Sequence, residues 1–141
     1  MKNRNIDHSD HWGTPAYIYD ELNKEFDFDF DPCPLHAEHD ALDPNFKWGE
    51  RNFVNPPYSR KLKEEFVRRA IHEKNMGKLC VMLLPVSTST YLFHEDILPN
   101  ITEPIRFAFK RIKFIGYNTK GEKVENKCGM HDSMIVIFDG R

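Results

Sequence analysis

Apolar residues recur at helical spacing in three stretches of the chain. The first helix is predicted from Thr14 to about residue 25, because Thr14 is a candidate N-cap and Pro15 suits the first helical position. The apolar residues that follow at helical intervals are Tyr17, Ile18, Leu22 and Phe26. Residues 61–75 predict an amphipathic helix, and residues 87–99 predict a capped helix that ends before its proline.

The other apolar stretches predict strands. Residues 26–32 alternate aromatic and acidic side chains, as in a half-buried strand, and stop at a proline. Residues 51–57 predict a short second strand, and the unbroken apolar run at 77–86 is typical of a buried strand in a parallel sheet. Residues 105–117 and 133–140 predict two more strands, joined as an antiparallel hairpin. The alternation of helices and strands predicts an α/β fold of three layers, with helices on both faces of the sheet.

Length and composition fit one globular domain over residues 1–141, in which the polar residues 1–11 form a flexible arm. The net charge is −2, so a partner rich in phosphate would have to meet a local basic patch. Only three cysteines occur, which indicates a reducing compartment. We expect a cytoplasmic protein without a membrane span, because no signal peptide and no long apolar run is present.

Polar clusters follow three of the predicted strands. Asp31 and Pro32 end the first, the sequence Asn-Pro-Pro-Tyr-Ser at 55–59 follows the second, and a run of Ser and Thr at 87–90 follows the third. In α/β folds, ligands bind at the carboxyl ends of the strands, so these clusters should meet there. Two prolines stop a sheet ladder abruptly, which leaves a stiff corner that presents an amide and an aromatic ring.

The Asn-Pro-Pro-Tyr sequence resembles the catalytic signature of amino-group methyltransferases that use S-adenosylmethionine. The sequence His-Trp-Gly-Thr-Pro at 11–15 resembles the element beside the cofactor in adenine-N6 enzymes, and Asp-Ala-Leu at 40–42 resembles their motif that contacts the cofactor adenine. From Trp12 to Phe138, the ordered set of motifs is similar to the small phage and prophage DNA adenine-N6 methyltransferases. The resemblance implies a truncated class I, Rossmann-like sheet with S-adenosylmethionine as cofactor and no metal.

The resemblance also implies roles for single residues. The Asn55 side-chain oxygen and the Pro56 carbonyl would accept hydrogen bonds from the two N–H groups of the target amine. Pro56 and Pro57 would fix the angle between these two acceptors. Tyr58 would stack on the adenine after it is flipped out of double-stranded DNA. Asp31 would lie at the cofactor's methionine part, and Asp40 would accept from its adenine amine. The full implied set of cofactor-binding residues is Trp12, Thr14, Pro15, Asp31, Pro32, Asp40, Leu42 and Asn55.

Polar and basic residues near these motifs are candidates for DNA contact. They are Ser59, Arg60, Lys61, Lys110, Arg111, Lys113 and Lys120. The chain departs from the family pattern in three ways. The loop at 31–36 has no glycine, Val86 and Ser87 stand where an arginine is frequent, and only about twenty residues separate the first two polar clusters. We infer that one edge of the sheet is cut away.

Several other interpretations stay open at this point. Residues 55–58 also suit a structural turn, Thr14 and Pro15 a plain helix start, and Asp31 a solvated strand end. The same chemistry could act on cytosine-N4, on RNA or on a protein glutamine, and the chain could be a non-catalytic DNA-binding module. Two Cys-x-x-His spacings, at 33–36 and 128–131, could hold zinc. The recognition sequence and the oligomeric state are left open.

Overall fold

The computed structural model describes residues 12–35, 37–117, 122–125 and 131–141. The predicted arm at 1–11 lies outside these residues. The helices and strands are α1 (Ala16–Phe26), β1 (Arg51–Val54), α2 (Arg60–Asn75), β2 (Leu79–Pro85), the π-helical η1 (Leu92–Ile97), β3 (Arg106–Phe107), β4 (Ile115–Tyr117), β5 (Lys123–Glu125) and β6 (Ser133–Asp139). Within the described residues, no helix has both the length and the apolar character that a membrane crossing requires.

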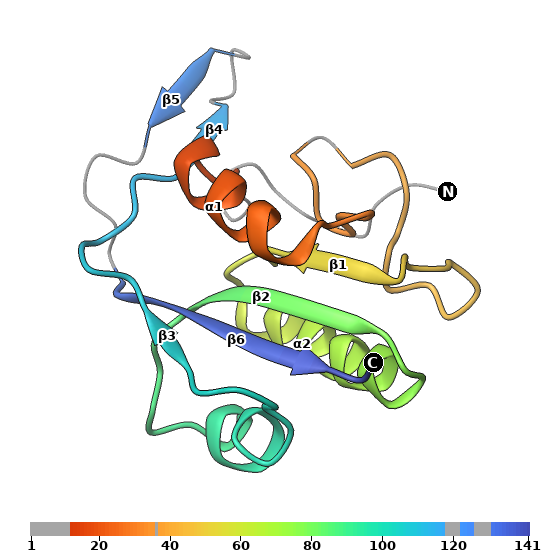
Figure 1. The fold of residues 1–141 in the computed structure, drawn as a ribbon. Helices are drawn as coiled ribbons and strands as arrows, with labels where there is room; N and C mark the ends of the chain where they lie inside the picture. The colour runs from red at the N-terminus through yellow and green to blue at the C-terminus, as the bar shows by residue number, and fades with distance from the viewer. Residues whose placement is uncertain (1–11, 36, 118–121, 126–130) are drawn as a thin grey trace.

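The main sheet has the strand order β1-β2-β6-β3 (Figure 1). β1 runs parallel to β2, with Phe53 opposite Val81. β6 is antiparallel to both of its neighbours, and Val81 also lies opposite Ile137. β4 and β5 pair with each other as a separate antiparallel ribbon, which extends from the main sheet beyond the start of α1 in Figure 1.

The central strand β2 is buried on both faces, as its unbroken apolar run predicts. The parallel sheet predicted from the same run is wrong for most of the sheet, because β2 is parallel only to β1 and antiparallel to β6. Cys80, Met82 and Leu84 pack into a core with α2 and η1, as part of a cluster that includes Phe66 and Phe93. The alternate residues of β2 pack on the opposite face, with α1 and the segment before β4. They are Leu79, Val81 and Leu83. Helices therefore cover both faces of the sheet, and the predicted three-layer α/β arrangement is confirmed at this level.

The strand predicted at 26–32 is wrong in extent. α1 ends at Phe26, its C-cap Asp27 has a left-handed φ of 52°, and the chain then runs beside β1. Only one bridge forms there, parallel, between Phe30 and Asn52. Pro32 and Pro34 follow immediately and have no backbone N–H, so the ladder does not continue past Phe30.

The long strand predicted at 105–117 is also wrong as one element. Its first part, β3, pairs with β6, and its last part, β4, pairs with β5. Between them Ile112 and Phe114 are buried under α1, because the chain leaves the sheet to fill that face. The predicted antiparallel partnership with 133–140 holds only for β3. The helix predicted at 87–99 is reduced to η1, and Thr90 Oγ1 accepts a hydrogen bond from Phe93 N at its start (3.2 Å).

Candidate active site

The Asn-Pro-Pro-Tyr sequence forms the turn between β1 and α2. β1 ends at Val54, and Asn55, Pro56 and Pro57 are all buried directly after it. Because the prolines lack N–H groups, the pairing with β2 stops at Val54 opposite Met82. The turn thus lies at the carboxyl end of a strand, where the sequence places it.

The side-chain amide of Asn55 is held in one orientation. Its Nδ2 donates to the Trp12 carbonyl oxygen (2.8 Å) and to Thr14 Oγ1 (2.9 Å). A backbone carbonyl only accepts, so Nδ2 and not Oδ1 must face Trp12. Two segments more than forty residues apart in the chain therefore meet at this amide.

The Asn55 carbonyl oxygen has no partner. Oδ1 is the one buried side-chain N or O atom of the described residues that lacks a hydrogen bond. A buried acceptor left unpaired costs about 1–3 kcal/mol, so such atoms are rare in native folds and call for an explanation. The Pro56 carbonyl likewise accepts from no described backbone N–H. The turn therefore offers Asn55 Oδ1 and the Pro56 carbonyl as two acceptors to which no backbone N–H of the described residues donates.

A cavity of about 440 Å³ adjoins this amide on the side of α1. Three of the predicted cofactor residues line it, namely Thr14, Asp31 and Asn55. Sequence reasoning missed other lining residues, among them Gly13, Tyr19 and Ile115. Gly13 lies within the His-Trp-Gly-Thr-Pro sequence and borders the cavity beside its bridge partner Ile115, so that motif was the signal for it. Tyr19 carried no such signal, because it occupies an ordinary position of the predicted helix.

Asp31 carries an uncompensated charge in this cavity. Burial raises its pKa from the usual 3.8 to about 6, and the hydrogen bond that its Oδ1 accepts from Cys33 N (2.9 Å) offsets only part of the rise. No cationic side chain of the described residues forms an ion pair with it. A half-buried carboxylate in this state favours a cationic ligand.

Of the remaining predicted cofactor residues, some lie near the Asp31 cavity and others do not. Trp12 packs over the ribbon, since a Cβ on Gly116 would lie 2.7 Å from its ring, and Pro15 and Pro32 are buried close to cavity residues. Asp40 instead closes a turn, where its Oδ1 accepts from Leu42 N (3.0 Å).

Leu42 lines a different cavity, beside Trp48 and Arg69. The structure therefore brings together Thr14, Asp31 and Asn55, and it does not place Asp40 or Leu42 with them.

Tyr58 is half-buried at the end of the turn. Its ring meets Phe114 edge-on with 5.7 Å between centroids and lies 6.2 Å from the His131 ring. Burial raises the pKa of its hydroxyl, which therefore stays protonated at neutral pH. The contact with Phe114 holds the turn against the segment between β3 and β4.

Two exposed groups of polar and basic residues flank this contact. Ser59, Arg60 and Lys61 begin just after Tyr58, where α2 starts. Lys110, Arg111 and Lys113 lie in the segment that contains Phe114. Arg60 is paired with Glu64 (3.2 Å) and Arg111 with Asp132 (3.3 Å), while Lys120 lies outside the described residues.

The two Cys-x-x-His pairs are not brought together as zinc ligands among the described residues. Cys33 is buried in the core and His131 is exposed beside Tyr58. His36 and Cys128, which would complete the two pairs, lie outside the described residues. Within the described part of the chain, no three His, Cys, Asp or Glu side chains form a group that could hold a metal.

Comparison with known proteins agrees with this geometry. No curated protein and no solved structure matches the chain. The sequence model of one family, described as DNA N-6-adenine-methyltransferase (Dam), matches residues 2–140. The match spans nearly the whole chain, including the turn at Asn55 and the segment at Thr14. The chain therefore belongs to the Dam family of DNA N6-adenine methyltransferases.

Proposed function

We propose that the protein transfers a methyl group from S-adenosylmethionine to adenine N6 in DNA, and that the adenine is flipped out of the duplex to reach Asn55. The observation that carries the proposal is the buried, unpaired Oδ1 of Asn55 at the edge of a cavity that holds the Asp31 carboxylate. The parallel pair β1-β2, with helices on both faces, supports a class I, Rossmann-like sheet.

The residues of the Asp31 cavity fit this cofactor. S-adenosylmethionine carries an ammonium and a sulfonium, and the unpaired carboxylate of Asp31 is a complementary group inside the cavity. When bound, the cofactor supplies a methyl group that its sulfonium has already activated. The tasks left to the protein are to hold the amine, to orient it and to exclude water.

Asn55 and Pro56 hold the target amine. The lone pair of an adenine amine is delocalised into the ring, so the amine is a poor nucleophile. Two acceptors that accept hydrogen bonds from both amine N–H groups favour a tetrahedral nitrogen, in which the lone pair is no longer delocalised into the ring. Asn55 Oδ1 can be the first acceptor, because Trp12 and Thr14 already bind both of its amide protons. The Pro56 carbonyl can be the second.

The positioning is prepared before substrate arrives. Asn55 is anchored at two points, and Pro56 and Pro57 restrict the backbone between β1 and α2. An acceptor fixed in this way requires little reorganisation during the reaction, which is the basis of electrostatic preorganisation. Tyr58 forms the wall of the site on the side of Phe114, and the ring of a flipped base can stack against Tyr58.

The experiment that tests the proposal measures the product. The protein is incubated with labelled S-adenosylmethionine and with DNA, RNA or protein, and the product is digested and identified by mass. We expect N6-methyladenine from DNA. N4-methylcytosine, methylguanine in RNA or methylglutamine as the product would show that the acceptor is a different amine. If no methylated product forms from DNA, RNA or protein, the chain is better described as a non-catalytic DNA-binding module.

A matched pair of variants tests the role of the turn. Asn55→Ala should lower the rate by about 10²–10³-fold, the usual effect of losing one preorganised hydrogen bond in the transition state. Asn75→Ala, an exposed asparagine at the end of α2, is the control and should keep the wild-type rate. Near-normal turnover in Asn55→Ala would contradict the proposed grip on the amine.

A further inference from the structure

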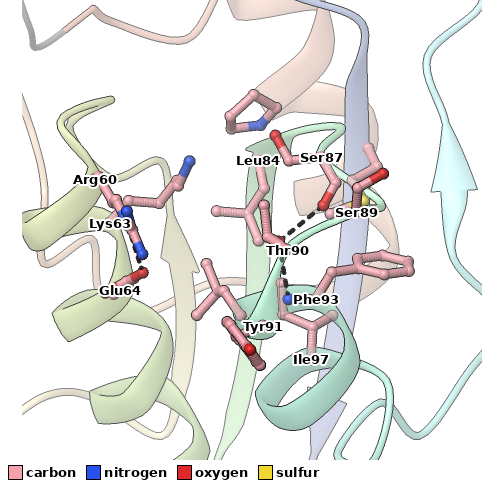
Figure 2. Close-up of a pocket in the computed structure, with 13 residues that line it drawn as sticks. Arg60, Lys63, Glu64, Leu84, Ser87, Ser89, Thr90, Tyr91, Phe93 and Ile97 are labelled. Carbon is pink, nitrogen blue, oxygen red and sulfur yellow. Dashed lines mark hydrogen bonds and ion pairs between the residues drawn. The ribbon is translucent and has the colours of Figure 1, made fainter.

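A second cavity, of about 360 Å³, lies on the face of the sheet that α2 covers (Figure 2). Its size is within the range of small-ligand sites, roughly 300–1,000 Å³. Arg60, Lys63 and Glu64 line it from α2, and Ser87 and Thr90 line it from the segment after β2. Figure 2 shows the two groups on opposite sides of the space between the helices.

The mouth of this cavity carries positive charge. Among the described residues that line it, Glu64 is the one carboxylate, and Glu64 is already bound to Arg60 (3.2 Å). Lys63 is half-buried, and among the described residues no carboxylate lies within ion-pair distance of its amino group. Burial lowers the pKa of Lys63, Glu64 opposes this by raising it, and neighbouring Arg60 has a smaller lowering effect. An ammonium that is partly desolvated and unpaired favours an anionic ligand.

The inner wall is apolar and the rim carries hydroxyls. Leu84, Leu92, Phe93, Ile97 and Met134 form the wall, and Ser87, Ser89 and Thr90 lie along the rim. Thr90 Oγ1 is used within the protein, since it donates to the Ser87 carbonyl (2.9 Å). No described group binds the hydroxyl of Ser89. A ligand that suits this cavity has an anionic group beside an apolar one, as a deoxyribose phosphate has.

The location connects this cavity to the reaction. Arg60 and Lys63 lie in the first turn of α2, directly after the turn that holds Asn55. The Asp31 cavity lies on the α1 face and carries negative charge, whereas this cavity lies on the α2 face and carries positive charge. The turn thus separates a site for a cationic ligand from a site for an anionic one.

We propose that the second cavity binds one sugar–phosphate unit of the target DNA strand, next to the flipped adenine. The phosphate binds Lys63 with the support of Arg60 and the rim hydroxyls, and the apolar face of the deoxyribose lies against the wall. A phosphate held here would fix the strand at one point, so that the flipped base reaches Asn55 in a constant position. This inference rests on the proposed function, because it takes DNA as the substrate.

The test pairs a protein variant with a DNA variant. Oligonucleotides carry a single uncharged methylphosphonate at each position in turn around the methylated adenine, and binding to each is measured. In the wild-type protein, a methylphosphonate at one position close to the adenine should weaken binding by about tenfold or more, as expected when a hydrogen bond to a charged group is lost. In Lys63→Met, binding to normal DNA should be weaker by a similar factor, and the same position should have no further effect.

One further variant is a control and another is a second test of the cavity. Lys74→Met removes the same charge from the other end of α2 and should keep the wild-type pattern of positions. Ser89→Trp fills the rim from an exposed loop position and should weaken DNA binding without changing cofactor affinity. It also serves if Lys63→Met fails to fold.

The inference is overturned if Lys63→Met keeps the wild-type response at every phosphate, or if it loses affinity evenly at all of them. A protein that binds DNA in this way but transfers no methyl group would contradict the proposed function and leave the phosphate site intact. A protein that methylates adenine normally with Lys63→Met would contradict the phosphate site alone.

Discussion

Replacing Asp31 with asparagine should stabilise the ligand-free protein and weaken its binding of S-adenosylmethionine. The change removes the charge but keeps the turn, because an asparagine Oδ1 can still accept from Cys33 N (2.9 Å in the wild type). Burial raises the Asp31 pKa from 3.8 to about 6 in the folded protein. The folded protein therefore holds this proton to a higher pH than the unfolded chain does, and the ionised carboxylate opposes folding.

The size of the effect follows from the shift. About two pKa units correspond to about 3 kcal/mol once the pH is well above 6. The stability that the protonated group contributes is complete below pH 3.8 and is lost as the pH rises through 6. The new amide protons need partners, which reduces the gain by about 1 kcal/mol. We therefore expect Asp31→Asn to be more stable than the wild type by about 2 kcal/mol at pH 8, and by much less at pH 4.5.

Urea unfolding of both proteins at pH 4.5 and pH 8 measures this difference. Asp43→Asn is the matched control, because Asp43 accepts from Asn45 N (2.9 Å) in the same kind of turn but in a more exposed place. Calorimetric titration at pH 8 should show weaker cofactor binding for Asp31→Asn only. The reasoning is refuted if the stability difference does not grow with pH, or if cofactor binding keeps its wild-type affinity.

Three further predictions concern the turn and the basic segment. Thr14→Val removes one hydrogen-bond partner of the Asn55 amide and should lower kcat by roughly fivefold to 150-fold, for about 1–3 kcal/mol. Thr14→Ser keeps the hydroxyl and should stay close to wild type. Initial rates at saturating DNA measure both, and equal damage in the two variants would argue against an anchoring hydroxyl. Tyr58→Ala should weaken DNA binding and turnover by about 1–3 kcal/mol through lost stacking, and Tyr58→Phe should be mild because the ring remains, so similar losses in both would exclude stacking as its role. Replacing Lys110, Arg111 and Lys113 together with alanine should reduce the log–log salt slope of DNA binding by about one for each phosphate that the protein no longer binds, and an unchanged slope would make this segment only a solvated surface.

Element types and the reaction class followed from the sequence to a large extent. The helical spacing before Phe26 predicted α1, and the unbroken apolar run predicted β2 as the buried centre of the sheet. The ordered motifs indicated the adenine-N6 methyltransferases, and the family match over residues 2–140 confirms that assignment. These features were accessible because periodicity and short motifs are local properties of the chain.

Strand extents were the weaker part of the prediction. An alternating pattern shows that one face of a segment is buried, but it does not show whether a partner strand is present along its whole length. Residues 26–32 had the right alternation, yet only Phe30 forms a bridge. Residues 105–117 are rich in apolar side chains, yet Ile112 and Phe114 fill the core beneath α1 instead of extending β3.

The arrangement at Asn55 was decided by the tertiary structure alone. The sequence placed Thr14 and Asn55 in two separate motifs, and only the fold shows that one side chain orients the other (2.9 Å). It also shows that Asp40 closes a local turn and that Lys63 lies beside a cavity, with no carboxylate of the described residues within ion-pair distance. The reason is physical: the amide of Asn55 is oriented by partners more than forty residues away, and hydrogen bonds of that range depend on how α1, β1 and the ribbon pack together.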